Sequence, residues 1–97
     1  MEFRCAASRF EAIDDGHVVG WLDFEQEGDA VAMTHTIVPD EYGGRGIGKA
    51  LTAHAVEYAR EHGWSILPYC TFIQAYLAHN PELAGLVPQS RRAQFSL

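Results

Sequence analysis

Apolar and polar residues alternate along the first third of the chain, and turn residues interrupt this pattern at regular intervals. Alternation with a period of two is typical of half-buried β-strands. The pattern predicts a first strand over residues 3–13, with a break in its alternation, which ends at an Asp-Asp-Gly turn. Two further strands are predicted over residues 17–25 and 30–38, joined by the turn at residues 27–29. We therefore expect three antiparallel strands that form a meander.

The third of these strands has its apolar residues at alternate positions. Val31, Met33, His35 and Ile37 are spaced by two and are therefore expected to share one face. His35 would then be a polar group among core side chains.

From residue 46 to residue 62 the apolar period becomes that of a helix. One stripe contains Ile47, Leu51, Ala55, Tyr58 and Ala59, and Gly63 follows as a helix-ending signal. A short strand is predicted over residues 64–70. Strand, glycine loop, helix and strand form a βαβ crossover, so this last strand should run parallel to the third.

A second, shorter helix is predicted over residues 71–79, and Pro81 ends it. One more turn is expected at residues 82–87, and the polar segment 88–97 either covers an edge of the sheet or frays. The residues expected on the buried side of this helix are Phe72, Ile73, Ala75, Tyr76 and Leu77. The prediction is thus a single α/β (α+β) domain over residues 1–97, with two main helices.

Composition and charge narrow the function classes. The net charge is −6, from 13 acidic and 7 basic residues, and no basic stripe opposes it, so a nucleic-acid partner is not expected. A basic amine would suit this acidity. No apolar run approaches the length of a membrane span and no signal segment is apparent, so we expect a cytoplasmic protein. The spacing of the two cysteines and five histidines fits neither a disulfide framework nor a metal site.

The segment from Val38 to Leu51 is the most informative of the sequence, because a strand leads into a glycine-rich loop that opens onto a helix. Four glycines lie within six positions, at 43, 44, 46 and 48. Glycines let the backbone fold closely around a ligand, and the free amides of a helix's first turn then face an anion. The pattern favours a phosphate or pyrophosphate cradle, and a turn that merely caps the helix is the alternative.

Two common phosphate-binding motifs do not fit this loop. A nucleoside-triphosphate loop needs Gly-Lys-Ser/Thr after four intervening residues, and counting from Gly43 or Gly44 does not reach it. The dinucleotide motif G-x-G-x-x-G appears only in reversed order, and no acidic residue follows a second parallel strand at the usual distance.

The loop closely resembles motif A of the GNAT superfamily of N-acetyltransferases, Gln/Arg-x-x-Gly-x-Gly/Ala. Gly46 and Gly48 match it, whereas Gly43 stands where the family has Gln or Arg. The predicted β-β-β-α-β-α order is also that of a shortened GNAT core. More narrowly, the chain resembles the small single-domain YjdJ-type subgroup, through His35-Thr36, Val38-Pro39, Pro68-Tyr69-Cys70 and His79-Asn80-Pro81.

The resemblance implies acetyl-coenzyme A as the cofactor, with its pyrophosphate held by loop amides. Arg45 and Lys49 would add positive charge, and the amide near Val38 would face the acyl carbonyl. The residues that the resemblance places at the cofactor are Ile37, Val38, Gly43, Gly44, Arg45, Gly46, Ile47, Gly48, Lys49 and Ala50.

Three residues are candidates for the chemistry. The resemblance places Tyr76 where GNAT enzymes carry the acid that protonates the leaving thiolate, and a core aromatic is the alternative. Cys70, at the end of the last strand, is either an acetyl-accepting nucleophile or a small buried residue. His35 is either the core polar group described above or the base beside Cys70. Cys5 has no such context and is expected to be structural.

Two functions therefore remain open. The domain is either an N-acetyltransferase that acts on an amine, directly or through Cys70, or a module that binds coenzyme A thioesters without turnover. The second is favoured by the absence of a predicted helix between the first strand and the meander, where GNAT enzymes build the acceptor cleft. The acceptor is not identified, and both a monomer and a homodimer fit the sequence.

Overall fold

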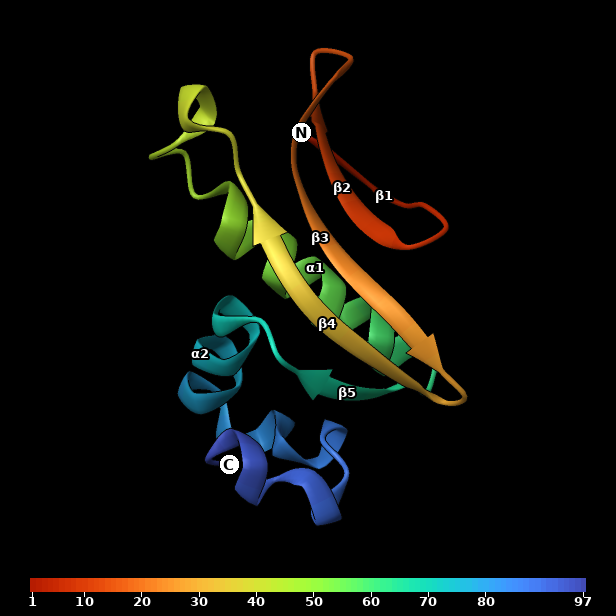
Figure 1. Ribbon diagram of the computed structural model, residues 1–97. Coiled ribbons are helices and arrows are strands. Elements are labelled where there is room, and N and C mark those ends of the chain that lie inside the picture. Colours follow the sequence, from red (N-terminus) through yellow and green to blue (C-terminus); the bar gives the residue numbers. More distant parts are fainter.

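The computed structural model describes residues 1–97 and contains one mixed five-stranded sheet (Figure 1). The strands follow the chain order across the sheet, and they are β1 (Glu2–Cys5), β2 (Arg9–Asp14), β3 (His17–Glu27), β4 (Ala30–Ile37) and β5 (Ser65–Pro68). Neighbours are antiparallel except β4 and β5, which are parallel. The α/β fold and the parallel crossover predicted from the sequence are therefore confirmed.

The predicted first strand is two strands, which corrects the expected strand count. The break in its alternation is a turn, where the Ala6 amide donates to the Arg9 carbonyl at 2.8 Å. The chain reverses there, and β1 pairs antiparallel with β2 from Cys5 opposite Phe10 onward. Small residues at positions 6–8 allow this reversal without an apolar side chain being lost from the core. Four antiparallel strands, rather than three, precede the crossover.

A β-bulge in β4 overturns the prediction that His35 shares a face with Met33. Met33 lies opposite Phe24 and His35 lies opposite Asp23, so Thr34 is an extra residue without a partner. Phe24 and Asp23 are consecutive in β3 and point to opposite faces. Met33 is fully buried, whereas His35 is exposed on the other face.

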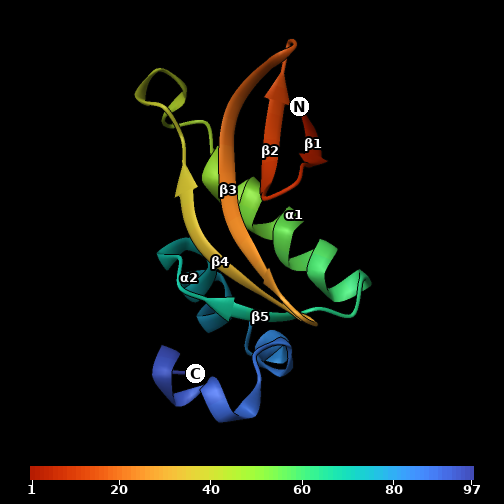
Figure 2. The same ribbon diagram turned by 45° about the vertical axis from the view of Figure 1, so that its right-hand side comes forward.

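Helix α1 (Ile47–Glu61) covers one face of the sheet, as both views show (Figures 1 and 2). The predicted apolar stripe is the side that it buries, with Ile47, Leu51 and Ala55 almost inaccessible to solvent. The helix lies close to β3 at Gly20, where a Cβ atom would lie 2.9 Å from Ile47 Cγ2. This contact sets the distance between the start of α1 and the sheet.

Helix α2 (Thr71–His79) follows β5 directly and lies beside α1 (Figure 2). It buries Ile73 and Leu77 in the same core. The predicted bounds of this helix are confirmed. Phe72 and Ala75 are exceptions to its predicted buried side, because 42% of Phe72 is exposed and Ala75 is exposed as well.

The C-terminal segment forms short 3₁₀ turns next to β5 (Figure 1). These turns are η2 (Pro81–Leu86), η3 (Gln89–Arg91) and η4 (Ala93–Phe95). Val87 is fully buried, and the ring of Phe95 packs edge-on against Tyr69 at 5.1 Å between centroids. Of the two alternatives for this segment, the structure shows packing rather than fraying.

Candidate functional site

The backbone amides of the glycine loop from Gly44 onward, at the start of α1, have no hydrogen-bond acceptors within the protein. Gly44 and Gly46 have φ angles of 80° and 73°, which L side chains rarely adopt. None of the amides from Gly44 to Lys49 donates a hydrogen bond to a backbone carbonyl, and no side chain caps the helix. Six consecutive donors thus have no partner within the protein, and they lie at the positive end of the α1 dipole. This is the geometry that binds phosphate groups.

A cavity of about 460 Å³ lies over these amides, and we call it the cradle cavity. Most of the predicted cofactor-binding residues line it, whereas Ile37, Arg45 and Ala50 do not. Its lining residues are Val38, Tyr42, Gly43, Gly44, Gly46, Ile47, Gly48, Lys49 and Phe72. The Val38 amide also donates no backbone hydrogen bond, so it is free to bind a ligand.

The two basic residues of the loop have different surroundings. The Arg45 guanidinium lies 3.9 Å from Asp14 and 5.5 Å from the ring centre of Tyr42, beside the cradle cavity. Lys49 has no ion-pair partner and lines the cavity itself. Lys49 is therefore the cation placed to meet an anion in the cradle.

Phe72 joins the cradle to the rest of the site. A Cβ atom on Gly48 would lie 2.7 Å from Phe72 Cε1, so only glycine lets the ring rest on the first turn of α1. Phe72 lines the cradle cavity and two further cavities. Its exposed ring, which the helical period assigned to the core, is thus a wall that all three cavities share.

The second cavity, of about 330 Å³, lies where β4 and β5 diverge, and we call it the thiol cavity. The residues that line it are Thr34, His35, Thr36, Tyr69, Cys70, Thr71 and Phe72. The Cys70 amide donates to the Met33 carbonyl at 2.9 Å, which is the last link between the two strands. Beyond it the strand ends separate and leave this opening.

Cys70 is almost fully buried in the thiol cavity and immediately precedes α2. Its sulfur lies 3.0 Å from the Thr36 hydroxyl, which can donate to it. The structure therefore brings two of the predicted catalytic residues, Cys70 and His35, to one cavity. It adds Thr36, which the sequence showed only as a neighbour of His35.

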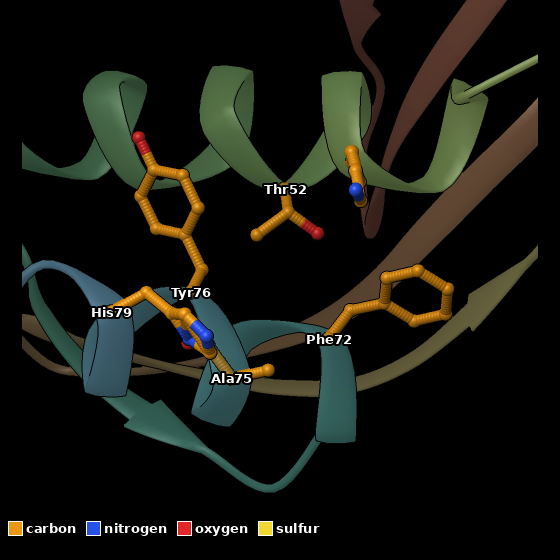
Figure 3. Close-up of a pocket in the computed structure, with 6 residues that line it drawn as sticks. Thr52, Phe72, Ala75, Tyr76 and His79 are labelled. Carbon is orange, nitrogen blue, oxygen red and sulfur yellow. The ribbon is translucent and has the colours of Figure 1, made fainter.

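Tyr76 lines a third cavity, of about 430 Å³ between α1 and α2, which we call the interhelix cavity. Its lining residues are Lys49, Thr52, Phe72, Ala75, Tyr76 and His79. In Figure 3 the Tyr76 hydroxyl points toward α1. Phe72 lies near the start of α2, about one turn before Tyr76. Tyr76 lines neither the thiol cavity nor the cradle cavity, and Phe72 is the residue common to all three cavities.

A cluster of aromatic rings lies between β1, β2 and α1, away from these cavities. His54 stacks on Phe3 with 4.8 Å between centroids, and partial burial lowers its pKa, although the charge of Glu61 acts in the opposite direction. A hydrogen bond between Tyr58 and Cys5, together with burial, raises the pKa of Tyr58. Cys5 is therefore part of the packing around α1.

No helix of the chain has both the length and the apolar character required to cross a bilayer. No three histidine, cysteine or acidic side chains are grouped to bind a metal ion.

Comparison with protein families decides the classification. A family model described as GCN5-related N-acetyl-transferase matches residues 9–86, which is well over half of the chain. The chain belongs to this family. The matched region of this GNAT domain contains the glycine loop, Cys70 and Tyr76.

The domain is also similar to Protein NATD1 of several vertebrates. The chicken (Gallus gallus), mouse (Mus musculus) and human (Homo sapiens) proteins are each 41% identical to it over 51 residues, or 53% of this chain. The matched segment spans 46% of the chicken and mouse proteins and 45% of the human protein. The similarity thus covers less than half of these relatives.

A solved structure shares the whole fold. A GCN5-like protein from Staphylococcus aureus, determined in solution by NMR, superposes with a TM-score of 0.66 at 26% identity. The match covers 90% of this GNAT domain and 87% of that chain. The fold of the family is therefore present almost end to end.

Sequence reasoning missed two parts of the site. Thr36 was recognisable only as part of the His-Thr pair, because its contact with Cys70 joins residues 34 positions apart. Asp23 and Glu25 line a further cavity together with His35. The place of His35 in this cavity depends on the bulge in β4. The bulge itself leaves no clear signal, since Met-Thr-His continues the strand pattern.

Proposed function

We propose that this GNAT domain is an acetyl-coenzyme A dependent N-acetyltransferase that transfers the acetyl group to an amine. The observation that carries this proposal is the junction at Phe72, where a cradle of six free amides adjoins a cavity that contains a buried thiol. A pyrophosphate in the cradle would leave the thioester end of the cofactor to reach the gap between β4 and β5. We propose acetyl-coenzyme A as the cofactor and an amine as the acceptor, together with the residue roles given below.

The cradle residues bind and orient the cofactor. The amides of residues 44–49 receive the pyrophosphate oxygens, and Lys49 adds a charge-assisted contact. The free amide of Val38 is suited to donate to the acyl oxygen as negative charge develops there.

The thiol cavity offers a covalent route for the acetyl group. The Cys70 sulfur attacks the acyl carbon, so that a bond from this carbon to Cys70 forms and its bond to the coenzyme A sulfur breaks. His35 accepts the thiol proton, which then passes to the leaving thiolate. An amine nitrogen next attacks acetyl-Cys70, the new C–N bond replaces the C–S bond, and the proton lost by the amine returns to the Cys70 sulfur. The net products are an N-acetylamine and coenzyme A.

Direct transfer is the alternative route and would use the same cradle. The amine then attacks the coenzyme A thioester, and an acid protonates the leaving sulfur. Tyr76 is the proposed acid, although this role requires the thioester end to lie on the interhelix side of Phe72.

Intact-mass measurement after incubation with acetyl-coenzyme A separates the routes. If Cys70 carries the acetyl group, the wild type gains one acetyl mass and Cys70→Ala gains none. Cys70→Ala should still bind acetyl-coenzyme A in a calorimetric titration, because the thiol does not form the cradle. Turnover by Cys70→Ala would establish direct transfer. Binding without transfer to any amine would show that the domain only binds coenzyme A thioesters.

A further inference from the structure

A fourth cavity, of about 340 Å³, opens on the sheet face that α1 does not cover. We call it the sheet-face cavity, and its lining residues are Ser8, Asp23, Phe24, Glu25, Thr34 and His35. Thr34 and His35 also line the thiol cavity, so the two cavities adjoin across the end of β4. The sheet-face cavity and the cavity that contains Cys70 are therefore neighbours with a common wall at Thr34 and His35.

The β4 bulge creates this arrangement. Without the extra residue Thr34, His35 would point to the α1 side with Met33, as the plain alternation suggested. With it, His35 lies opposite Asp23 on the uncovered face. Glu25 lies two residues further along β3 and points to the same face as Asp23.

The charge of the cavity differs from that of the cradle. Asp23 is partly neutralised by Arg9, whose Nε atom is 3.5 Å from Asp23 Oδ1 and whose guanidinium lies 5.0 Å from the ring centre of Trp21. Glu25 has no ion-pair partner. An anion would therefore be repelled from this cavity, and a cation would be attracted. These side chains do not form a group that could hold a metal ion, so an organic cation fits better.

We infer that the amine acceptor is an aliphatic diamine whose second, protonated nitrogen lies in the sheet-face cavity beside Glu25 and Asp23. Because the reacting nitrogen must meet the acetyl group in the thiol cavity, this inference rests on the proposed function. The reacting nitrogen forms the C–N bond and loses a proton to the sulfur that departs. The second nitrogen keeps its proton and does not react. His35, which lines both cavities, would lie beside the chain that joins the two nitrogens.

Calorimetry with 1,4-diaminobutane and 1-butylamine tests this assignment on the full chain in the presence of coenzyme A. The two amines share a reacting group and a carbon chain, and only the diamine carries the second charge. We expect the diamine to bind about tenfold more tightly, which is the size of one charge-assisted contact. Glu25→Gln should remove most of this preference and leave 1-butylamine binding unchanged. Asp23→Asn should lower the preference as well.

Glu27→Gln is the matched control, because Glu27 is an exposed acid on the same strand that does not line the cavity. This variant should keep the full preference, which separates the cavity from the general acidity of the protein. In turnover assays with the diamine, Glu25→Gln should raise KM and leave kcat unchanged.

Equal affinities for the two amines, or a preference that survives both Glu25→Gln and Asp23→Asn, would overturn the assignment. Coenzyme A binding, measured in the same preparation, reports on the proposed function alone. If coenzyme A binds and the diamine preference is absent, only the acceptor assignment is lost. If coenzyme A does not bind, the proposed function fails and the acceptor assignment fails with it.

Discussion

The Thr36 hydroxyl lies 3.0 Å from the Cys70 sulfur, although 34 residues separate them along the chain. The two residues come from the ends of β4 and β5, which are parallel neighbours that part just before this contact. A hydroxyl that donates to a sulfur stabilises the thiolate, which is the form that attacks a thioester. The pair therefore links the strand topology to the chemistry proposed for Cys70.

Replacing Thr36 tests this link. Thr36→Val should slow acetylation of Cys70 by about 10- to 100-fold, because a hydrogen bond to a charged group contributes about 1.5–3 kcal/mol. Thr36→Ser, which keeps the hydroxyl, should restore most of the rate. The rate is measured by intact mass over time, and acetyl-coenzyme A affinity should be unchanged in both variants. An unchanged rate in Thr36→Val would mean that the hydroxyl has no part in the reaction.

Gly46→Val should abolish acetyl-coenzyme A binding. Gly46 has positive φ, and a Cβ atom there would meet no protein atom within 4 Å, so the side chain would occupy the cradle cavity itself. Gly16→Val is the matched control, since Gly16 also has positive φ and an open surrounding but lies in the β2–β3 turn.

Both glycine variants should be destabilised, by at least about 1–2 kcal/mol for the left-handed backbone. Only Gly46→Val should lose acetyl-coenzyme A binding. Calorimetry measures the binding, and thermal unfolding measures the stability of both variants. Loss of binding in both variants would mean that backbone strain alone explains the effect, and retained binding in Gly46→Val would rule out the cradle.

Gly20→Ala should lower the free energy of unfolding by about 1–3 kcal/mol, because it overpacks the contact between β3 and α1. The added carbon would lie 2.9 Å from Ile47 Cγ2 and 3.3 Å from the Ile37 carbonyl oxygen. Gly85→Ala, where the added carbon meets nothing within 4 Å, should change stability little. Urea unfolding of the two variants measures the difference, and equal midpoints would contradict the close approach seen here.

Stability should fall as the pH drops below about 6.5, in part through His54. Burial lowers the pKa of folded His54 below its unfolded value, so in this range the unfolded chain binds a proton that the folded chain does not. The stability contributed by neutral His54 is complete above the unfolded pKa and is lost as the pH falls toward the folded pKa. Urea unfolding across pH 5–8 should show a shallower decline in His54→Gln than in the wild type. Identical declines would exclude His54 as a cause.

Tyr76→Phe should lower the rate of acetyl transfer and leave cofactor affinity unchanged if the Tyr76 hydroxyl is the acid. The comparison needs both a rate assay and a calorimetric titration. A loss of affinity at unchanged kcat would instead make Tyr76 a wall of the interhelix cavity. Acetylation of Cys70 at the normal rate in Tyr76→Phe would assign Tyr76 no part in the covalent route.

The sequence alone predicted the elements that depend on local pattern. The helix over Thr71–His79 and the stripe on α1 followed from the spacing of apolar residues, and the loop from the density of glycines. The parallel placement of β5 followed from the crossover rule, which depends only on chain connectivity. The glycine positions also carried the family resemblance, because Gly46 adopts a positive φ and Gly48 leaves room for the ring of Phe72.

Only the tertiary structure decided which side chains meet. The bulge at Thr34 moved His35 to the uncovered face, since one unpaired residue reverses the alternation for every residue after it. The exposure of Phe72 and the contact of Thr36 with Cys70 depend on how α2 and β4 lie relative to α1 and β5. Such contacts join distant positions through packing, which periodicity along one segment does not encode.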